Sequence, residues 1–294
     1  MSNWTGLGIG TKNSDGDWIE MFFAEENISS EDLESSDAAF EKVSVSDEKA
    51  PTSVPEAYLK LHLLSYRLVK PNETNLDGIF GILQNVVWTS EGPFSIADFK
   101  KAQLEARKEN RHILVHSIDK FPRMTDYVTL SDVRIADANR VRLGAYLGSG
   151  TTIMHEGFVN FNAGSLGEAM IEGRISQGVV IGDKTDIGGG ASTMGTLSGG
   201  NDVRISLGKN CLLGANSGLG IPLGDRCTVE AGLYLTASSK VEVIDDKGEI
   251  ETVKASELAS KSDLLFIRNS LTGSIQCRPN KKVIELNEEL HSND

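Results

Sequence analysis

An aliphatic residue returns at every sixth position through the middle of the chain, between Ile135 and Val241. A period of six fits neither an amphipathic helix nor a half-buried strand. It is typical of a solenoid of short parallel strands, in which three hexapeptides make one triangular coil. The pattern therefore predicts a parallel β-helix with four aliphatic registers inside it: Ile135, Val141, Leu147, Ile153 and Val159; Ala169, Ile175, Ile181 and Ile187; Leu207, Leu213 and Leu219; and Leu223, Val229, Leu235 and Val241.

Two other positions of the repeat support this fold. A small or β-branched residue, such as Ala145 or Thr151, follows four places after the aliphatic one and leaves room at a corner. The residue directly after the aliphatic one is often Gly, as at Gly148 and Gly214, and we expect these glycines to adopt the positive φ of a tight corner.

The repeat is interrupted twice, near Gly164–Met170 and at Thr193–Asp202. The second interruption is rich in Gly and polar residues. We expect it to leave the coil as a loop, because its backbone would have no hydrogen-bond partner inside.

The segments on either side of the repeat indicate two further domains. The first fifty residues are Gly-rich and mixed, and their acidic, Ser-rich run Ser29–Ser36 is expected to be a solvated loop. Helices are expected from Pro55 and over Ile96–Glu109, the second with Ser95 as its N-cap. Strand-like pieces at 264–268 and 274–277 follow the repeat, and the tail 283–291 fits a strand or a short helix. The expected domains are an N-terminal α/β domain (1–125), the β-helix (126–243) and a small β-rich C-terminal cap (244–294).

Charge and cysteine usage narrow the class of protein. The net charge is −13, but residues 1–56 hold 13 Asp and Glu against 3 Lys and Arg, so the acidity belongs mostly to the N-terminal part. This balance argues against nucleic-acid binding. The sequence shows no apolar run long enough for a membrane span and no secretory leader. Cys211, Cys227 and Cys277 show no metal-ligand spacing, and we expect buried, reduced thiols in a cytoplasmic protein.

Several short strings within the repeat are more specific than the repeat itself. The segments 154–164, 171–176, 188–200 and 211–220 resemble the longer-chain branch of the tetrahydrodipicolinate N-succinyltransferase family, and 230–234 and 264–270 fit it too. The resemblance is good from about residue 126 to 270 and weak over the first hundred residues.

The resemblance implies a left-handed β-helix and a homotrimer with active sites between chains. It also implies succinyl transfer from succinyl-CoA to the amino group of ring-opened tetrahydrodipicolinate, in lysine and diaminopimelate synthesis. The partners would be small-molecule substrates, with neither nucleic acid nor a membrane involved. Mg²⁺ is associated with this branch of the family.

Glu172 matches the family's catalytic glutamate. An amine must lose a proton as it attacks a thioester, and a positioned carboxylate can accept it. The same residue has also been assigned to a covalent acyl-anhydride in this branch, and the sequence does not separate the two roles. Arg174 lies two residues on, on the same face if the segment is extended, and could hold a substrate carboxylate in bidentate fashion.

The remaining site residues also follow from the resemblance. Glu156 matches a metal-contacting residue, whereas Asn139 stands where the family's second metal position carries an aspartate. His155, next to Glu156, is expected to be structural. The positions expected to bind substrate and acyl-CoA are Arg174, Gly189, Ser192, Ala215, Glu230, Ala231, Ser238, Lys254, Arg268, Asn269 and Ser270.

Two other functions share the coil. One is a different hexapeptide acyltransferase with an acetyl donor or a sugar-amine acceptor, but such enzymes commonly rely on a histidine, and the pattern here centres on a carboxylate. The other is a non-catalytic scaffold, which would need neither the Glu172 and Arg174 pair nor the excursion at 193–202. Because fold alone does not decide function, the local strings favour the succinyltransferase.

Overall fold

The computed structural model describes residues 2–197, 203–245 and 247–280. The chain divides into two compact units. One holds the residues up to Thr129 together with Arg142–Gly144, and the other holds Leu130–Val141 and the residues from Ala145 onward. The expected strand or helix at 283–291 lies outside the described residues.

The first unit begins with an antiparallel sheet in the order β2-β1-β3. Helix α1 packs against this sheet and begins after Ser53, whose hydroxyl accepts the Glu56 N–H. Strand β1 carries Gly6 and Gly8 where a Cβ would lie within 3 Å of the Phe23 side chain. These glycines let the sheet close tightly over its own core. The bounds are β1 (Asn3–Lys12), β2 (Trp18–Ser29), β3 (Glu41–Ser46) and α1 (Val54–Ser65).

A second antiparallel sheet in the same unit has the order β5-β4-β6, with helix α3 following β5. The expected N-cap is confirmed, because the Ser95 hydroxyl accepts the Asp98 N–H at 3.1 Å. The expected helix from Pro55 is confirmed as α1. The bounds are α2 (Ile79–Ile82), β4 (Val86–Thr89), β5 (Gly92–Ser95), α3 (Ile96–Lys108) and β6 (Val115–Asp119).

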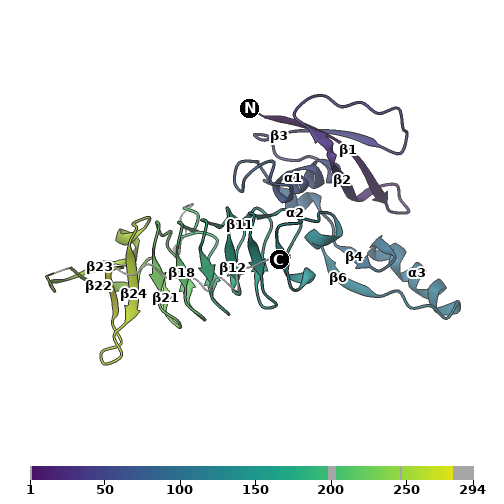
Figure 1. Cartoon of the computed structure of the whole chain (residues 1–294). Coiled ribbons are helices and arrows are strands. Elements are labelled where there is room, and N and C mark those ends of the chain that lie inside the picture. Colours follow the sequence, from purple (N-terminus) through teal and green to yellow (C-terminus); the bar gives the residue numbers. More distant parts are fainter. Residues whose placement is uncertain (1, 198–202, 246, 281–294) are drawn as a thin grey trace. The chain divides into compact units, whose positions relative to one another are not determined.

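The second unit is the predicted left-handed parallel β-helix, whose strands stand side by side along the coil (Figure 1). Its strands form three faces, which the chain visits in the order A, B, C. Face A holds β8 (Ala145–Leu147), β11 (Ala163–Ser165), β14 (Val180–Ile181) and β17 (Ser206–Leu207). Face B holds β7 (Arg134–Ile135), β9 (Thr151–Ile153), β12 (Ala169–Ile171), β15 (Asp186–Ile187), β18 (Leu212–Leu213), β20 (Thr228–Val229) and β24 (Leu264–Arg268). Face C holds β10 (Phe158–Val159), β13 (Arg174–Ile175), β16 (Ser192–Thr193), β19 (Gly218–Leu219) and β21 (Tyr234–Leu235).

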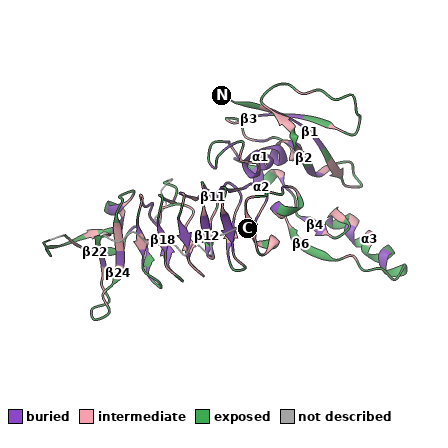
Figure 2. Cartoon of the chain, viewed as in Figure 1, coloured by how far each residue is buried: buried purple, intermediate pink, exposed green. Residues whose placement is uncertain are grey.

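The interior of the coil is built as the repeat predicts, except at Ala169. This residue was expected in the second aliphatic register, but it pairs with Thr151 at a small position, and Ile171 takes the aliphatic position beside Ile153. The aliphatic positions from Val141 to Val241 are at most 3% exposed, and Figure 2 shows the strands of the coil as largely buried. The small positions that follow them, including Ala163, Thr185 and Cys211, are equally buried. The two positions of the hexapeptide therefore fill one continuous apolar core.

The expected reason for the glycines after the aliphatic positions was wrong. These glycines, at 148, 182, 188, 208, 214 and 224, do not adopt positive φ. A Cβ on Gly148 would instead lie 2.4 Å from the Gly167 nitrogen, and one on Gly214 would lie 2.4 Å from the Ala231 nitrogen. They are needed for the close approach of one coil to the next. In the coil, positive φ occurs directly before a small or β-branched residue at Gly150, Asn162, Gly178, Lys184, Gly190, Asn210, Asn216 and Arg226, and before Leu233 at Gly232.

The first expected interruption was also wrong in its position. Strands β11 and β12 pair in register with the coils around them, so the coil continues through 164–170. Ser165 occupies an interior position, and its hydroxyl hydrogen-bonds with Thr151 of the neighbouring coil. Ser165, hydrogen-bonded to Thr151, thus takes the place of an aliphatic residue. The six-residue pattern of aliphatic residues is therefore interrupted in the sequence although the coil continues.

The true irregularity lies at the next corner, between faces B and C. The interior residues Ile171 and Ile175 are four positions apart, whereas their neighbours in the preceding coil, Ile153 and Val159, are six apart. The corner made by Glu172 and Gly173 is therefore two residues short. Both of its N–H groups donate to the same carbonyl, that of Ile187. A second shortened corner joins Leu219 to Leu223.

The excursion after β16 leaves the coil as expected. Its described base is antiparallel, with the Leu197 N–H donating to the Val203 carbonyl and the Ile205 N–H to the Gly195 carbonyl. The rest of the expected excursion, residues 198–202, lies outside the described residues.

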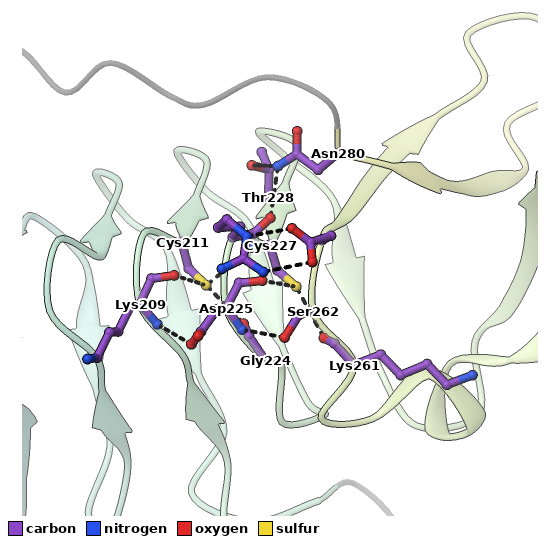
Figure 3. Close-up of polar contacts among 11 residues, drawn as sticks. Lys209, Cys211, Gly224, Asp225, Cys227, Thr228, Lys261, Ser262 and Asn280 are labelled. Atoms are coloured by element: carbon purple, nitrogen blue, oxygen red, sulfur yellow. Dashed lines mark hydrogen bonds and ion pairs between the residues drawn. The ribbon is translucent and has the colours of Figure 1, made fainter. Parts of the chain in front are cut away.

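The C-terminal strands β22 (Lys240–Ile244), β23 (Ile250–Lys254) and β25 (Ile275–Pro279) extend face B through β24. Figure 3 shows the contacts at this end of the coil. Arg226 forms a forked ion pair with Asp263, and the buried Cys211 and Cys227 donate to backbone carbonyls of the following turns. The three cysteines are free and buried, as predicted.

Among the described residues, no helix is both long and apolar enough to cross a membrane.

The packing of the coils predicts a specific effect of Gly164→Ala. Gly164 has φ +146°, and a Cβ there would lie 1.8 Å from the Tyr146 carbonyl oxygen of the adjacent strand. We expect this variant to lower the free energy of unfolding by about 2–6 kcal/mol, from strain and overpacking together. Urea denaturation followed by circular dichroism measures this.

Gly248→Ala is the matched control, because Gly248 also has positive φ but nothing lies within 4 Å of its Cβ position. It should cost only about 1 kcal/mol. Equal stability of the two variants would contradict the close approach at Gly164.

Candidate functional site

The corners between faces B and C form a continuous edge, which we call the BC edge. Each corner residue donates its N–H to the last carbonyl of a face-B strand in the next coil. The Glu172 N–H donates to Ile187 and the Gly188 N–H to Leu213, at 2.8 Å in both cases. The edge therefore carries one corner per coil, in the order Met154, Glu172, Gly188, Gly214 and Glu230.

The shortened corner lies between two longer ones and sets back this part of the edge. A Cβ on Gly173 would lie 2.4 Å from the Ala191 carbonyl oxygen, so the short corner is pressed against the coil that follows it. A groove of about 390 Å³ opens beside it. Its walls come from four successive coils, and it is lined by Arg140, Glu156, Phe158, Gly173, Arg174, Gly190, Ala191 and Ser192.

Glu172 and Arg174 lie on either side of the buried Gly173. Glu172 is half-buried, and its carboxylate extends along the BC edge, with Oε2 3.3 Å from the Cβ position of Gly189. Arg174 is exposed on face C, and its Nη2 donates to the Ser192 hydroxyl at 2.6 Å. Arg174 lines the groove and Glu172 adjoins it. The shortened corner of the BC edge thus carries a carboxylate on one side of Gly173 and a guanidinium on the other.

Sequence reasoning missed Arg140. It lines the same groove as Arg174, and its Nη2 lies 3.6 Å from Glu156 Oε2. The repeat held the necessary signal, because Arg140 directly precedes the interior Val141, just as Arg174 precedes Ile175. Val141 bridges Val159, and Phe158 pairs with Arg174, so these outward positions form one column. The groove therefore carries two guanidinium groups.

The expected acyl-CoA positions divide into two groups. The first follows the BC edge away from Glu172. The Asn216 N–H donates to the Gly189 carbonyl and the Gly232 N–H to the Ala215 carbonyl, which stacks these corners coil upon coil. At the end of this row, Glu230 Oε2 accepts the Arg268 N–H at 2.6 Å. The structure thus brings together, on one edge, Glu172, Gly189, Ala215, Glu230, Ala231 and Arg268.

The second group lies in the C-terminal strands. Lys254 pairs with Lys240 across β22 and β23, and the Ala255 N–H donates to the Ser239 carbonyl, so Ser238 lies beside Lys254. Ser238 follows β21, so Ser238 and Lys254 lie at a different corner of the coil from Glu172. Asn269 and Ser270 belong to the turn after β24, where Asn269 Oδ1 accepts the Leu271 N–H at 2.9 Å.

The described residues of a single chain do not form a magnesium site by themselves. The Glu156 side chain is 79% exposed, and its carboxylate faces Arg140. Asn139 donates its side-chain amide to Asp137. Within the described ranges, no three His, Cys, Asp or Glu side chains are grouped so as to hold a metal ion. One ion-paired carboxylate does not fit Mg²⁺, which prefers several oxygen ligands.

Comparisons with known proteins agree across the two units. The model "Tetrahydrodipicolinate N-succinyltransferase N-terminal" matches residues 12–81, and "Tetrahydrodipicolinate N-succinyltransferase middle" matches 83–123. The model "Hexapeptide repeat of succinyl-transferase" matches 204–237. The first hundred residues, where the resemblance in the sequence was weak, therefore carry family-specific segments.

Full-length relatives support the same assignment. The chain is 61% identical to 2,3,4,5-tetrahydropyridine-2,6-dicarboxylate N-succinyltransferase of Vibrio cholerae over 85% of this chain and 73% of that protein. It is 58% identical to the enzyme of the same name from Pseudomonas aeruginosa, with the same shares covered.

A solved structure extends the similarity to the fold. The crystal structure of a putative 2,3,4,5-tetrahydropyridine-2-carboxylate N-succinyltransferase from Campylobacter jejuni superposes with a TM-score of 0.87 at 30% identity, covering 96% of this chain and 93% of that one. Because the similarity spans most of the chain at high identity and joins the same coil to the same N-terminal segments, this protein belongs to the tetrahydrodipicolinate N-succinyltransferase family.

Proposed function

We propose that this chain catalyses succinyl transfer from succinyl-CoA to the amino group of tetrahydrodipicolinate whose ring water has opened, a step of lysine and diaminopimelate synthesis. The observation that carries the proposal is the 58–61% identity to enzymes named for this reaction. The local chemistry agrees with it, because a groove lined by two guanidinium groups, those of Arg140 and Arg174, lies beside the shortened corner that carries Glu172.

The acceptor binds in the groove beside Glu172. It carries two carboxylates, and a guanidinium can hold a carboxylate through two parallel hydrogen bonds. Arg174 is the primary clamp, since its guanidinium is exposed and is held in place by Ser192. Arg140 supplies a second positive charge, which Glu156 partly balances.

The donor lies along the BC edge. The corner residues Gly189, Ala215 and Ala231 have no large side chains, so a long, flexible ligand can approach their backbone closely. Ala215 and Ala231 are exposed, which leaves this path open along the coil. The thioester then lies near Glu172, and the nucleotide end lies toward Arg268 and the C-terminal strands, where Lys254 and Ser238 supply a cation and a hydroxyl.

The chemistry needs one base. The acceptor nitrogen attacks the thioester carbonyl carbon, a C–N bond forms and the C–S bond breaks. The Glu172 carboxylate takes the proton that the nitrogen loses and returns it to the departing CoA sulfur. The products are the succinylated amine and CoA, with Glu172 unchanged.

Glu172→Gln tests this role. Gln keeps the size and polarity of the side chain but cannot accept the proton, so we expect kcat to fall by roughly 10²–10⁴-fold with binding of succinyl-CoA nearly unchanged. A coupled thiol-release assay measures kcat, and Glu251→Gln, an exposed substitution on β23, is the control. Near-normal turnover of the Glu172→Gln variant would contradict the role of Glu172 as the base.

The same protein distinguishes a base from a covalent acyl carrier. Wild-type enzyme is incubated with labelled succinyl-CoA alone, quenched quickly and digested. A base leaves no label on Glu172, whereas label there would assign the anhydride route instead.

Arg174→Ala should behave differently from Glu172→Gln. Loss of a clamp that already holds the substrate in the ground state raises KM for the acceptor, with a smaller effect on kcat. Arg174→Lys keeps the charge but not the fork and should lie between the two. Lys209→Ala removes another exposed cation from the coil and serves as control. Equal KM values for the Arg174→Ala and Lys209→Ala variants would contradict the clamp.

We further propose that the active enzyme is a homotrimer in the cytoplasm. The groove is shallow and built on the outside of a coil, so a neighbouring chain is needed to enclose it. Light scattering at micromolar concentration should give about three times the chain mass of 31.7 kDa. A monomer with full activity would contradict this proposal.

A further inference from the structure

The N-terminal unit contains a second cavity, separate in chemistry from the BC edge. Its volume is about 420 Å³, within the range of small-molecule sites. Its walls come from β2, from β4 and the turn after it, from β5 and β6, and from the segment 123–127. The side chains that decide its chemistry are Glu20, Phe22, Trp88, Arg123, Asp126 and Tyr127.

Glu20 is the buried charge of this cavity. It is only 6% exposed, and its Oε2 accepts the Tyr127 hydroxyl at 2.9 Å. Burial raises its pKa above the ordinary value, and hydrogen bonds from Thr11 and Tyr127 oppose this rise. Throughout the described ranges, Lys, Arg and His form no ion pair with it. Hydrogen bonds from neutral groups satisfy its oxygens but leave its charge unbalanced.

The other two charged side chains of the cavity, Arg123 and Asp126, form an ion pair with each other. Arg123 Nε donates to Asp126 Oδ2 and its Nη2 lies near Asp126 Oδ1, both at 2.9 Å. Neighbouring polar side chains are also engaged, since the Thr89 hydroxyl donates to the Gly92 carbonyl. His116 of β6, which is exposed, also lines the cavity. Of the two carboxyl groups in the lining, Glu20 is the one that has no cationic partner among the described residues.

Aromatic rings line the same cavity as Glu20. The Tyr127 ring lies 6.5 Å from Phe22 and 6.3 Å from Trp88, centre to centre. Trp88 is buried, but Phe22 is 40% exposed although its neighbours Met21 and Phe23 are fully buried. Faces of Trp, Tyr and Phe attract cations, and their edges and methylenes favour an apolar body.

We propose that this cavity binds a small organic ammonium ion, with its charged nitrogen directed to Glu20 and its apolar body among Phe22, Trp88 and Tyr127. An anion would meet the Glu20 carboxylate, and a neutral ligand would leave that charge unbalanced. The site lies within the N-terminal unit, and its existence does not depend on the succinyl-transfer proposal.

The test uses the full chain labelled with 5-fluorotryptophan, which gives Trp88 its own ¹⁹F signal, assigned by a Trp88→Phe variant. The probes are n-butylamine, butan-1-ol and butyrate, which share an apolar body and differ in charge. We expect only n-butylamine to shift the Trp88 signal saturably at neutral pH. Glu20→Gln should weaken this binding at least about tenfold, as is usual for loss of a charged hydrogen-bond partner.

Glu26→Gln, an exposed carboxylate on the same strand, is the matched control and should not change the affinity. Should Glu20→Gln fail to fold, Phe22→Ala tests the aromatic wall at an exposed position and should also weaken binding. The proposal is overturned if n-butylamine produces no saturable shift, if butan-1-ol binds equally well, or if the Glu20→Gln and Glu26→Gln variants bind alike.

Discussion

The backbone hydrogen bonds between successive coils are the constraint on which the site depends. They place each residue beside its counterpart in the next coil, so that Ile153 lies next to Ile171 and Phe158 next to Arg174. Side chains at equivalent repeat positions then form columns along the coil. The column that contains Arg140 and Arg174, and the edge that contains Glu172, owe their existence to this ladder and to no contact among the functional side chains themselves.

Loss of two residues at one corner changes this regular surface into a site. A uniform coil presents the same outline at each turn and has no hollow of its own. The step from Ile171 to Ile175 sets Glu172 and Gly173 back, while the longer corners on either side form walls. The small residues at Gly173 and Gly190 keep the hollow open. The catalytic proposal thus rests on a defect in the repeat, and the surrounding regularity holds that defect in place.

The sequence was sufficient to predict the coil and most of its interior positions, because a period of six translates directly into columns. The corner residues from Glu172 to Arg268 were expected from the family resemblance, and the period alone did not single them out. It was insufficient where a buried residue departs from the aliphatic rule. Ser165 is interior because Thr151 supplies a hydrogen-bond partner, and that partner becomes a neighbour only in the folded coil. The glycines after the aliphatic positions were predicted, but for the wrong reason, since the close approach of another coil is not visible in local sequence. The strands β1 and β2 were not predicted, for a similar reason. Gly6 and Gly8 of β1 are unfavourable in an isolated strand, and only their packing against Phe23 of β2 requires them.

The spacing of the coils also fixes distances along the BC edge. Neighbouring parallel strands lie about 4.8 Å apart, so the edge offers one corner residue at each such interval. The coils that carry Glu172, Gly189, Ala215, Glu230 and Arg268 follow one another in this order. The number of coils that a bound molecule spans therefore sets the distance between its reacting end and its far end. Adding or deleting a whole coil would change the length of ligand that fits, while the chemistry at the shortened corner would stay the same.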